Sequence, residues 1–294
     1  MNRTLVDKAA GWLTKAVALL SLCILAFMIL GLLVKSGGIL SANSPSKLLL
    51  SSDWRPSKGE FGFFPYITGT FIVTVLAMVF SVPVCLFSAV YLTEYSGRRF
   101  RSLVKSGIDT LAGIPSVVFG LWGVLFIVPL VREVIAPAFG VETSGYCILS
   151  GALVLAVMVV PIILSIMEDV ILTVPRDLKE ASYAVAATRW DTVKHVILPR
   201  TAHGLFSAVI LGFSRAFGET MAILMVVGNV AVHAKSVFDP AYPLTALIAN
   251  NYGEVLSIPL YDSALMFAAL ILLVIVVVFN VLARSILARM KTEG

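Results

Sequence analysis

The chain has 294 residues, of which 59% are apolar and 13% are charged, about half the charged share of an ordinary soluble domain. The mean hydropathy is +0.97, which excludes a soluble enzyme of this size and also a disordered chain, since disorder needs low hydrophobicity and high charge. The net charge of +5 comes without a basic patch interleaved with aromatic residues, so it indicates basic membrane loops and not nucleic-acid binding. The composition therefore predicts an integral membrane protein.

Six charge-poor apolar runs are each long enough to cross a bilayer as a helix of about 20 residues. They lack the alternating polarity of an outer-membrane barrel. The fold class predicted is an all-α, six-helix polytopic membrane protein. The spans are expected near Trp12–Val34, Gly69–Leu92, Thr110–Val131, Gly145–Met167, His203–Val227 and Ser263–Ala283. We expect residues 1–65 to form a tail, the first span and an outer loop, and residues 66–294 to form a core of five spans.

The Lys and Arg residues between these spans predict the orientation. Fifteen of them fall in the N-terminal tail, the second loop, the fourth loop and the C-terminal tail, whereas six fall in the other loops. Because basic loops stay in the cytoplasm, both termini and the fourth loop are predicted to be cytoplasmic. The expected location is the bacterial inner membrane, where the chain is surrounded by the lipid bilayer.

Two segments on the predicted outer side are longer than simple connectors. Residues 35–65 are rich in Ser, Lys, Pro and Gly around Trp54, and could lie on the membrane or touch an external partner. Residues 235–262 carry prolines on either side of Leu244–Ala249, which could form a short helix dipping into the outer face. The alternative for both segments is an ordinary exposed loop.

The fourth loop, residues 168–200, has signals for two short helices. Pro175 suits the start of a helix, and Asp177 suits its positive N-terminal end. Thr188 and Asp191 are spaced like a capping box that opens a second helix, which we expect to stop at Leu198-Pro199. Two helices joined by a tight turn predict a rigid cytoplasmic knob, with a plain linker as the alternative.

The same loop resembles the EAA loop of ABC-transporter permeases, through Glu180-Ala181-Ser182 followed by Val196-Ile197-Leu198-Pro199. In that family the loop docks into a separate ATP-hydrolysing subunit and transmits its closure to the membrane helices. The resemblance implies that coupling residues in this chain are Glu180, Ala181, Ser182, Ala184, Ala186, Leu198 and Pro199. The family usually has Gly where this chain has Ala186. Since Ala is strained in a left-handed backbone, we expect either another turn geometry or an adjustment at Ala187 and Thr188.

Arg215 and Glu219 lie inside the fifth predicted span. On a continuous helix, two residues that are four positions apart differ in direction by only about 40°, so both side chains would point the same way. Arg215 would lie on the order of 20 Å along the helix from Thr201. An Arg at such a depth costs roughly 2.5–3.5 kcal/mol, so it should face a partner or a wet cavity. One reading is an intrahelical ion pair that neutralises itself. The other is that the guanidinium binds an anion with several oxygens. Glu219 would then hold the guanidinium in place and weaken its binding of the anion, so that the anion can leave.

A second, narrower resemblance supports an oxyanion. Residues 215–221, Arg-Ala-Phe-Gly-Glu-Thr-Met, with Gly228-Asn229 following, are similar to the fifth-span motif of C-type permeases of phosphate ABC importers. Residues 111–120 and Gly69-Thr70 are similar as well. The resemblance implies a phosphate pathway through Arg215, Glu219 and Thr220. It also implies partners: an A-type phosphate permease subunit as heterodimer, two ATP-binding subunits and an extracytoplasmic phosphate-binding protein.

The chain has no phosphate-binding GxxxxGK[ST] motif of its own, and its three histidines do not cluster with Cys or carboxylates as metal ligands would. We therefore expect a transport subunit that is not an enzyme and has no cofactor, metal site or catalytic residue. Import of another oxyanion, such as phosphonate, molybdate or sulfate, remains an alternative. A stand-alone anion channel or exchanger would leave the knob without a purpose, and an intramembrane enzyme lacks any catalytic constellation.

Overall fold

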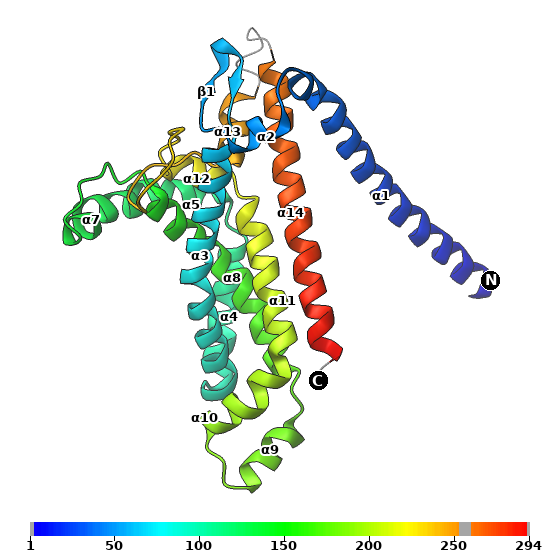
Figure 1. The fold of residues 1–294 in the computed structure, drawn as a ribbon. Coiled ribbons are helices and arrows are strands. Elements are labelled where there is room, and N and C mark those ends of the chain that lie inside the picture. Colours follow the sequence, from blue (N-terminus) through cyan, green and yellow to red (C-terminus); the bar gives the residue numbers. More distant parts are fainter. Residues whose placement is uncertain (1–2, 253–259, 293–294) are drawn as a thin grey trace.

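The computed structural model describes residues 3–252 and 260–292, and within them the chain is mostly helical (Figure 1). In this described part of the chain, six helical stretches are long and apolar enough to cross a membrane, which confirms the predicted all-α, six-span membrane protein. They cover Ala10–Ala42, Phe64–Tyr95, Ser116–Ala138, Ile148–Leu172, Arg189–Phe217 and Tyr261–Ala288. In lipid, a helix can form such a span because it satisfies its own backbone hydrogen bonds.

Five long helices dominate the fold, and shorter elements connect them. The long helices are α1 (Arg3–Ala42), α3 (Phe64–Val90), α8 (Ile148–Leu172), α11 (Leu198–Phe217) and α14 (Tyr261–Thr292). Before α8 the shorter elements are α2 (Pro45–Leu50), β1 (Trp54–Arg55), the 3-10 turn η1 (Pro56–Lys58), β2 (Glu60–Phe61), the π-helical turn η2 (Tyr91–Tyr95), α4 (Arg98–Ala112), α5 (Ser116–Trp122), the π-helical turn η3 (Gly123–Ile127), α6 (Val128–Leu130), the π-helical turn η4 (Val131–Ile135) and α7 (Ala136–Ala138). After α8 they are α9 (Arg176–Ala184), α10 (Arg189–Thr192), the π-helical turn η5 (Val193–Ile197), α12 (Met221–Val226) and α13 (Leu244–Asn251).

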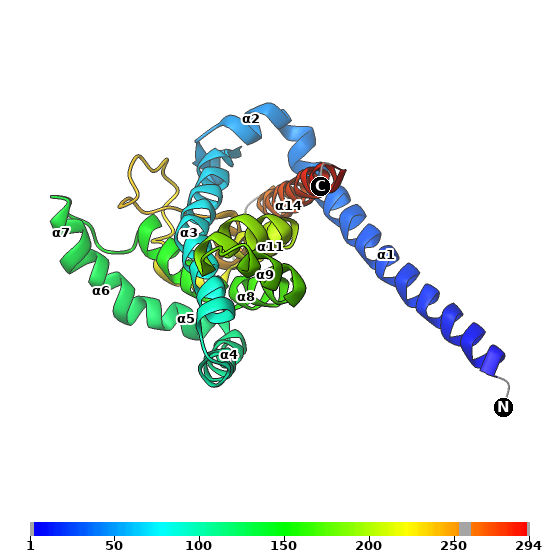
Figure 2. The same cartoon turned by 90° about the horizontal axis from the view of Figure 1, so that it is seen from below.

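The core is a bundle in which α3, α8, α11 and α14 run side by side (Figure 1). The helix α8 is the most enclosed, with 72% of its most apolar 18-residue window buried, whereas the corresponding window of the first span is 0% buried. Seen from below, α1 leaves the bundle on one side and α6–α7 leave it on the other (Figure 2). Apolar side chains exposed in this way need lipid or another protein chain around them.

The first span is fastened to the bundle at its C-terminal end. The Ser263 hydroxyl on α14 donates a hydrogen bond to the Lys35 carbonyl at 2.9 Å and accepts one from the Ile39 amide at 2.9 Å. This pair of bonds holds the end of α1 against the start of α14. The rest of the helix leans outward (Figure 1).

The boundaries predicted for the third span are wrong at the start. The expected span, Thr110–Val131, crosses a break, because α4 ends at Ala112 and α5 begins at Ser116. Pro115 explains the break, since proline lacks the backbone N–H and also disfavours helical geometry in the residue before it. The third span therefore runs over Ser116–Ala138.

The second helix of the fourth loop does not stop at Leu198-Pro199 as expected. It continues through η5 into α11, with Pro199 in the first turn of α11. A proline inside a helix cannot donate its i→i−4 hydrogen bond and crowds the carbonyl four residues earlier. The wider turn of η5, where the Leu198 amide bonds to the Val193 carbonyl, makes room for the ring at this point.

The first long outer segment is folded and is not an ordinary exposed loop. Strands β1 and β2 pair in antiparallel fashion, and the Trp54 ring makes edge contacts with Phe61, Phe63 and Tyr66 at centroid distances of 5.4, 5.4 and 4.9 Å. Phe63 and Tyr66 are fully buried. Such aromatic contacts hold the hairpin to the N-terminal end of α3.

The short helix expected in the second outer segment is present. It is α13, and its first four residues, Leu244–Leu247, are buried. It lies at the same end of the bundle as the hairpin (Figure 1). The rest of this segment includes residues 253–259, which lie outside the described part of the chain.

Candidate functional site

Two regions contain the residues singled out by sequence: the knob, formed by α9 and α10, and an interruption of the fifth span. The knob lies at the end of the bundle opposite the hairpin of β1 and β2 (Figure 1). Its helices start where predicted, α9 directly after Pro175 with Asp177 in its first turn, and α10 after Thr188. The capping box is confirmed, because the Thr188 amide donates to Asp191 Oδ2 at 3.2 Å and the Asp191 amide donates to Thr188 Oγ1 at 3.2 Å.

The turn between the two helices has a left-handed residue at Ala186, with φ of 59°. The expectation that an alanine here would change the turn, or shift the strain to Ala187 and Thr188, is therefore wrong. The reason is the closure of α9: the Ala186 amide bonds to the Tyr183 carbonyl at 2.9 Å and the Ala187 amide to the Ser182 carbonyl at 3.3 Å. A left-handed residue after the helix end is the usual way to make such bonds, and in alanine it costs about 1–2 kcal/mol.

We expect Ala186→Gly to stabilise the knob by about 0.5–1 kcal/mol, because glycine adopts the left-handed conformation without the clash and loses only part of that gain as entropy. Ala184→Gly is the matched control, since Ala184 is helical and glycine should cost about 1 kcal/mol there. Hydrogen exchange of the α9 amides measures both. Slower exchange in Ala184→Gly than in Ala186→Gly would contradict the strained turn.

The knob presents an apolar tip. Glu180, Ala181, Ala184, Ala186 and Pro199 are exposed, and Ser182 and Leu198 are half-buried. Beside them, large apolar side chains of the knob are exposed: Leu178, Tyr183, Trp190 and Val185, the last with 79% of its surface accessible. Apolar side chains gathered on a projection indicate a surface that another protein covers.

Two polar contacts fasten α9. The Ser182 and Thr192 hydroxyls lie 2.9 Å apart and join α9 to α10. The Lys179 ammonium lies 2.6 Å from Glu94 Oε1 in η2, at the end of α3. Sequence reasoning missed this second contact, because nothing local indicates that residues 85 positions apart would meet.

The fifth span is interrupted, so the prediction of one helix from His203 to Val227 is wrong. The helix α11 ends at Phe217, residues Gly218–Thr220 belong to neither helix, and α12 begins at Met221. We call Gly218–Thr220 the break. An interruption inside a membrane is tolerated where protein or a water-filled cavity surrounds the freed backbone groups.

Arg215 lies just before the break, whereas Glu219 lies within it. Arg215 is exposed in the last turn of α11, whereas Glu219 is half-buried, and its carboxylate accepts a hydrogen bond from the Ala222 amide at 3.5 Å at the start of α12. Within residues 3–252 and 260–292, none of the three ion pairs includes either residue. The intrahelical ion pair is therefore not the arrangement present, and Arg215 keeps its guanidinium donors available.

The small residues near Arg215 on the sequence serve packing. Gly212 is buried, and a Cβ atom added there would collide with the Ile163 side chain of α8. Ala208 and Ala222 are also buried, while Gly218 is exposed beside Arg215. Of these four small residues, Gly218 is therefore the one that leaves room around the charge of Arg215.

A network of hydrogen bonds connects the break to α13 and α3. The Thr245 hydroxyl donates to the Glu219 carbonyl at 2.9 Å, so α13 satisfies a backbone group that the break frees. The Leu244 amide donates to Thr70 Oγ1 at 2.8 Å, and Gly69 lies against Ala241. The motifs Gly69-Thr70 and Glu219-Thr220, distant in sequence, thus meet through α13.

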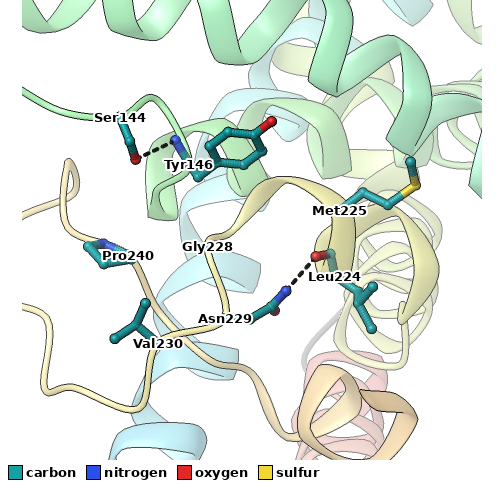
Figure 3. Close-up of a pocket in the computed structure, with 8 residues that line it drawn as sticks. All are labelled: Ser144, Tyr146, Leu224, Met225, Gly228, Asn229, Val230 and Pro240. Atoms are coloured by element: carbon teal, nitrogen blue, oxygen red, sulfur yellow. Dashed lines mark hydrogen bonds between the residues drawn. The ribbon is translucent and has the colours of Figure 1, made fainter.

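Gly228-Asn229 lies apart from Arg215, beyond the other end of α12. Both residues have positive φ, 93° and 54°, and the side-chain amide of Asn229 donates a hydrogen bond to the Leu224 carbonyl at 2.7 Å (Figure 3). They line a cavity of about 350 Å³ together with Ser144, Tyr146, Leu224, Met225, Val230 and Pro240. Gly228-Asn229 therefore follows the C-terminal end of α12 and is not part of the surroundings of Arg215.

The chain matches the family described as binding-protein-dependent transport system inner membrane component over residues 81–292. It is 37% identical to the phosphate transport system permease protein PstC of Xylella fastidiosa, over 83% of this chain and 79% of that protein. It is 34% identical to the phosphate transport system permease protein PstC of Haemophilus influenzae, over 100% and 97% of the two chains. A crystallised bacterial ABC transporter involved in import of the acidic polysaccharide alginate has a chain of the same fold, with a TM-score of 0.59, 18% identity and coverage of 97% and 99%.

Proposed function

Because the chain belongs to the family of binding-protein-dependent transport system inner membrane components, we propose that it is the permease subunit of an ATP-driven importer of inorganic phosphate. In this role it forms half of the translocation pathway and couples to a separate ATPase. The observation that carries the proposal is the likeness to phosphate permeases at 34–37% identity over 83–100% of the chain. The exposed Arg215 beside the break gives the substrate proposal a physical basis.

The test is uptake of radiolabelled phosphate by vesicles that contain the whole transporter, with ATP inside. We expect uptake that needs both ATP and the binding protein and that sulfate, molybdate and phosphonate do not inhibit. Competition by one of these anions would move the assignment to another oxyanion. Uptake without any ATPase subunit would make the chain a channel and contradict the proposal.

As a permease of an ABC importer, the chain acts with an ATPase and a binding protein. In more detail, we propose that the chain forms a heterodimer with an A-type phosphate permease. Two ATP-binding subunits and a phosphate-binding protein on the outer side would join this heterodimer. The splayed first span, with 0% of its apolar window buried, supports a second membrane subunit beside this one. The chain itself is a transport subunit, and ATP hydrolysis is proposed to belong to the partners.

The proposed phosphate pathway includes Arg215, Glu219 and Thr220. A guanidinium presents a planar fork of donors that fits two oxygens of one anion, and Arg215 is free of ion pairs among the described residues. Glu219 and Thr220 lie in the break itself. An interrupted span is a common way to build a substrate site in transporters, because it exposes backbone groups to the substrate.

The proposed coupling residues are Glu180, Ala181, Ser182, Ala184, Ala186, Leu198 and Pro199. The apolar tip of the knob supports a docking role for this region, since it includes Val185 with 79% of its surface exposed. We also propose that residues 1–65 form a peripheral unit and residues 66–294 the core permease. The match of the family to residues 81–292 supports this division.

The chain is a multi-pass membrane protein, and we propose that both termini are cytoplasmic. Single cysteines introduced at Ser46 and Val237, in a chain whose Cys23, Cys85 and Cys147 are replaced, should react with an impermeant thiol reagent in intact cells. A cysteine at Ser102 should react only after the cells are opened. All three positions are exposed, so the result depends on which side of the membrane each position faces. Reaction at Ser102 alone in intact cells would reverse the orientation.

A further inference from the structure

We propose that the ion pair between Lys179 and Glu94 is a mechanical link that transmits movement of the knob to α3, which makes both residues positioning residues for transport. The inference rests on the proposed function, since it needs an ATPase that moves the knob. It assigns a role to two side chains outside the coupling motif and outside the substrate pathway.

The ion pair is short and protected from water. The Lys179 Nζ to Glu94 Oε1 distance is 2.6 Å, and the two side chains are 18% and 8% exposed. The pair between Lys105 and Asp169, at the same end of the bundle, spans 3.1 Å with side chains 39% and 63% exposed. Exposed pairs contribute little because water and salt screen them, whereas loss of one partner of a buried pair leaves an uncompensated charge.

The pair is also the fastening of α9 to the membrane helices. Among the hydrogen bonds and ion pairs of the described residues, it alone joins a side chain of α9 to an element outside the loop of residues 168–200. The hydroxyl contact between Ser182 and Thr192 stays within the knob. A push on α9 therefore reaches the rest of the chain through the short connection of residues 173–175 into α8, through α10 and η5 into α11, and through Glu94 into α3.

The routes through α11 and through α3 both end at the break. The helix α11 leads directly to Arg215 and Phe217, where the break begins. At the other end of α3 from Glu94, Thr70 accepts the hydrogen bond of the Leu244 amide, and the neighbouring Thr245 hydroxyl holds the Glu219 carbonyl. A helix transmits displacement along its axis, so movement of Glu94 and movement of α11 act on the two sides of the same three residues.

The experiment compares phosphate transported with ATP hydrolysed in vesicles that contain the complete transporter. Lys179→Met and Glu94→Gln each remove one charge and keep the side-chain length. We expect each to lower the phosphate moved per ATP by roughly tenfold, a size typical of a lost coupling contact, while the ATPase subunits stay bound. A merely structural role would lower assembly and both activities together, and leave their ratio unchanged.

The reversed pair, Glu94→Lys with Lys179→Glu, decides between the mechanical link and a merely structural role. It should restore at least half of the wild-type ratio, since an ion pair tolerates exchange of its ends. A reversed pair that fails to assemble, or that stays as uncoupled as the single variants, would overturn the link, as would a normal ratio in both single variants. Lys105→Met is the matched control and should keep the wild-type ratio. Absence of phosphate uptake in the wild-type complex would instead contradict the proposed function, and is read separately.

Discussion

Arg215→Gln is expected to lower ATP-driven phosphate uptake by about 30-fold or more, while the complex still assembles and its ATPase still binds nucleotide. The physical reason is the loss of a charge-assisted, two-pronged contact to the anion, since removing one partner of a desolvated charge pair costs about 2 kcal/mol or more. Arg215 is exposed beside the break, so its replacement leaves no cavity in the core. Initial rates of labelled phosphate uptake in vesicles measure the effect.

One further substitution at Arg215 separates the geometry of the guanidinium from its charge, and one substitution elsewhere serves as a control. Arg215→Lys should recover only part of the uptake, because an ammonium is a point charge without the planar fork. Arg284→Gln removes a charge from an exposed position on α14 and should leave uptake unchanged. Uptake at the wild-type rate in Arg215→Gln would remove this residue from the pathway.

Glu219→Gln tests the second charge without removing the cap of α12. Its Oε1 atom accepts the Ala222 amide, and a glutamine oxygen can accept the same hydrogen bond. Impaired uptake in this variant therefore reports the missing charge and not a loosened helix. If the pair were only structural, replacing Arg215 and Glu219 together by apolar residues would restore both stability and phosphate uptake, and that result would falsify the direct role of the pair.

The second large effect is expected at the tip of the knob. Val185→Asp should abolish co-purification of the ATPase subunits, because it places a charge on an apolar surface that docking has to desolvate. Val185 is 79% exposed, so the change should leave the fold of the chain intact. Pull-down of the ATPase from detergent-solubilised membranes measures the result, with the amount of inserted chain as reference.

Val232→Asp is the matched control, since this valine is exposed in the segment after α12, far along the chain from the knob. It should keep the ATPase bound. Cysteines at Ala184 or Ala186 should in addition cross-link to a co-expressed ATPase. Normal co-purification in Val185→Asp, with no cross-link from any position of the knob, would place the docking surface elsewhere.

The sequence by itself determined the features that depend on local chemistry. Long apolar runs predict spans wherever the chain lies in a bilayer, and all six are found. The start of α9 after Pro175 and the capping box of Thr188 and Asp191 were predictable, because a helix start depends on side chains within three or four residues. The likeness of the fifth-span motif to phosphate permeases also needed no coordinates.

Only the tertiary structure decided how these parts meet. Apolarity continues past Gly218, so hydropathy could not place the break, where the Thr245 hydroxyl on α13 satisfies the Glu219 carbonyl. The left-handed Ala186 is imposed by the hydrogen bonds that close α9. The Lys179–Glu94 pair joins residues 85 positions apart. Contacts between distant segments depend on the packing of whole helices, and the residues near each position in sequence contain no record of that packing.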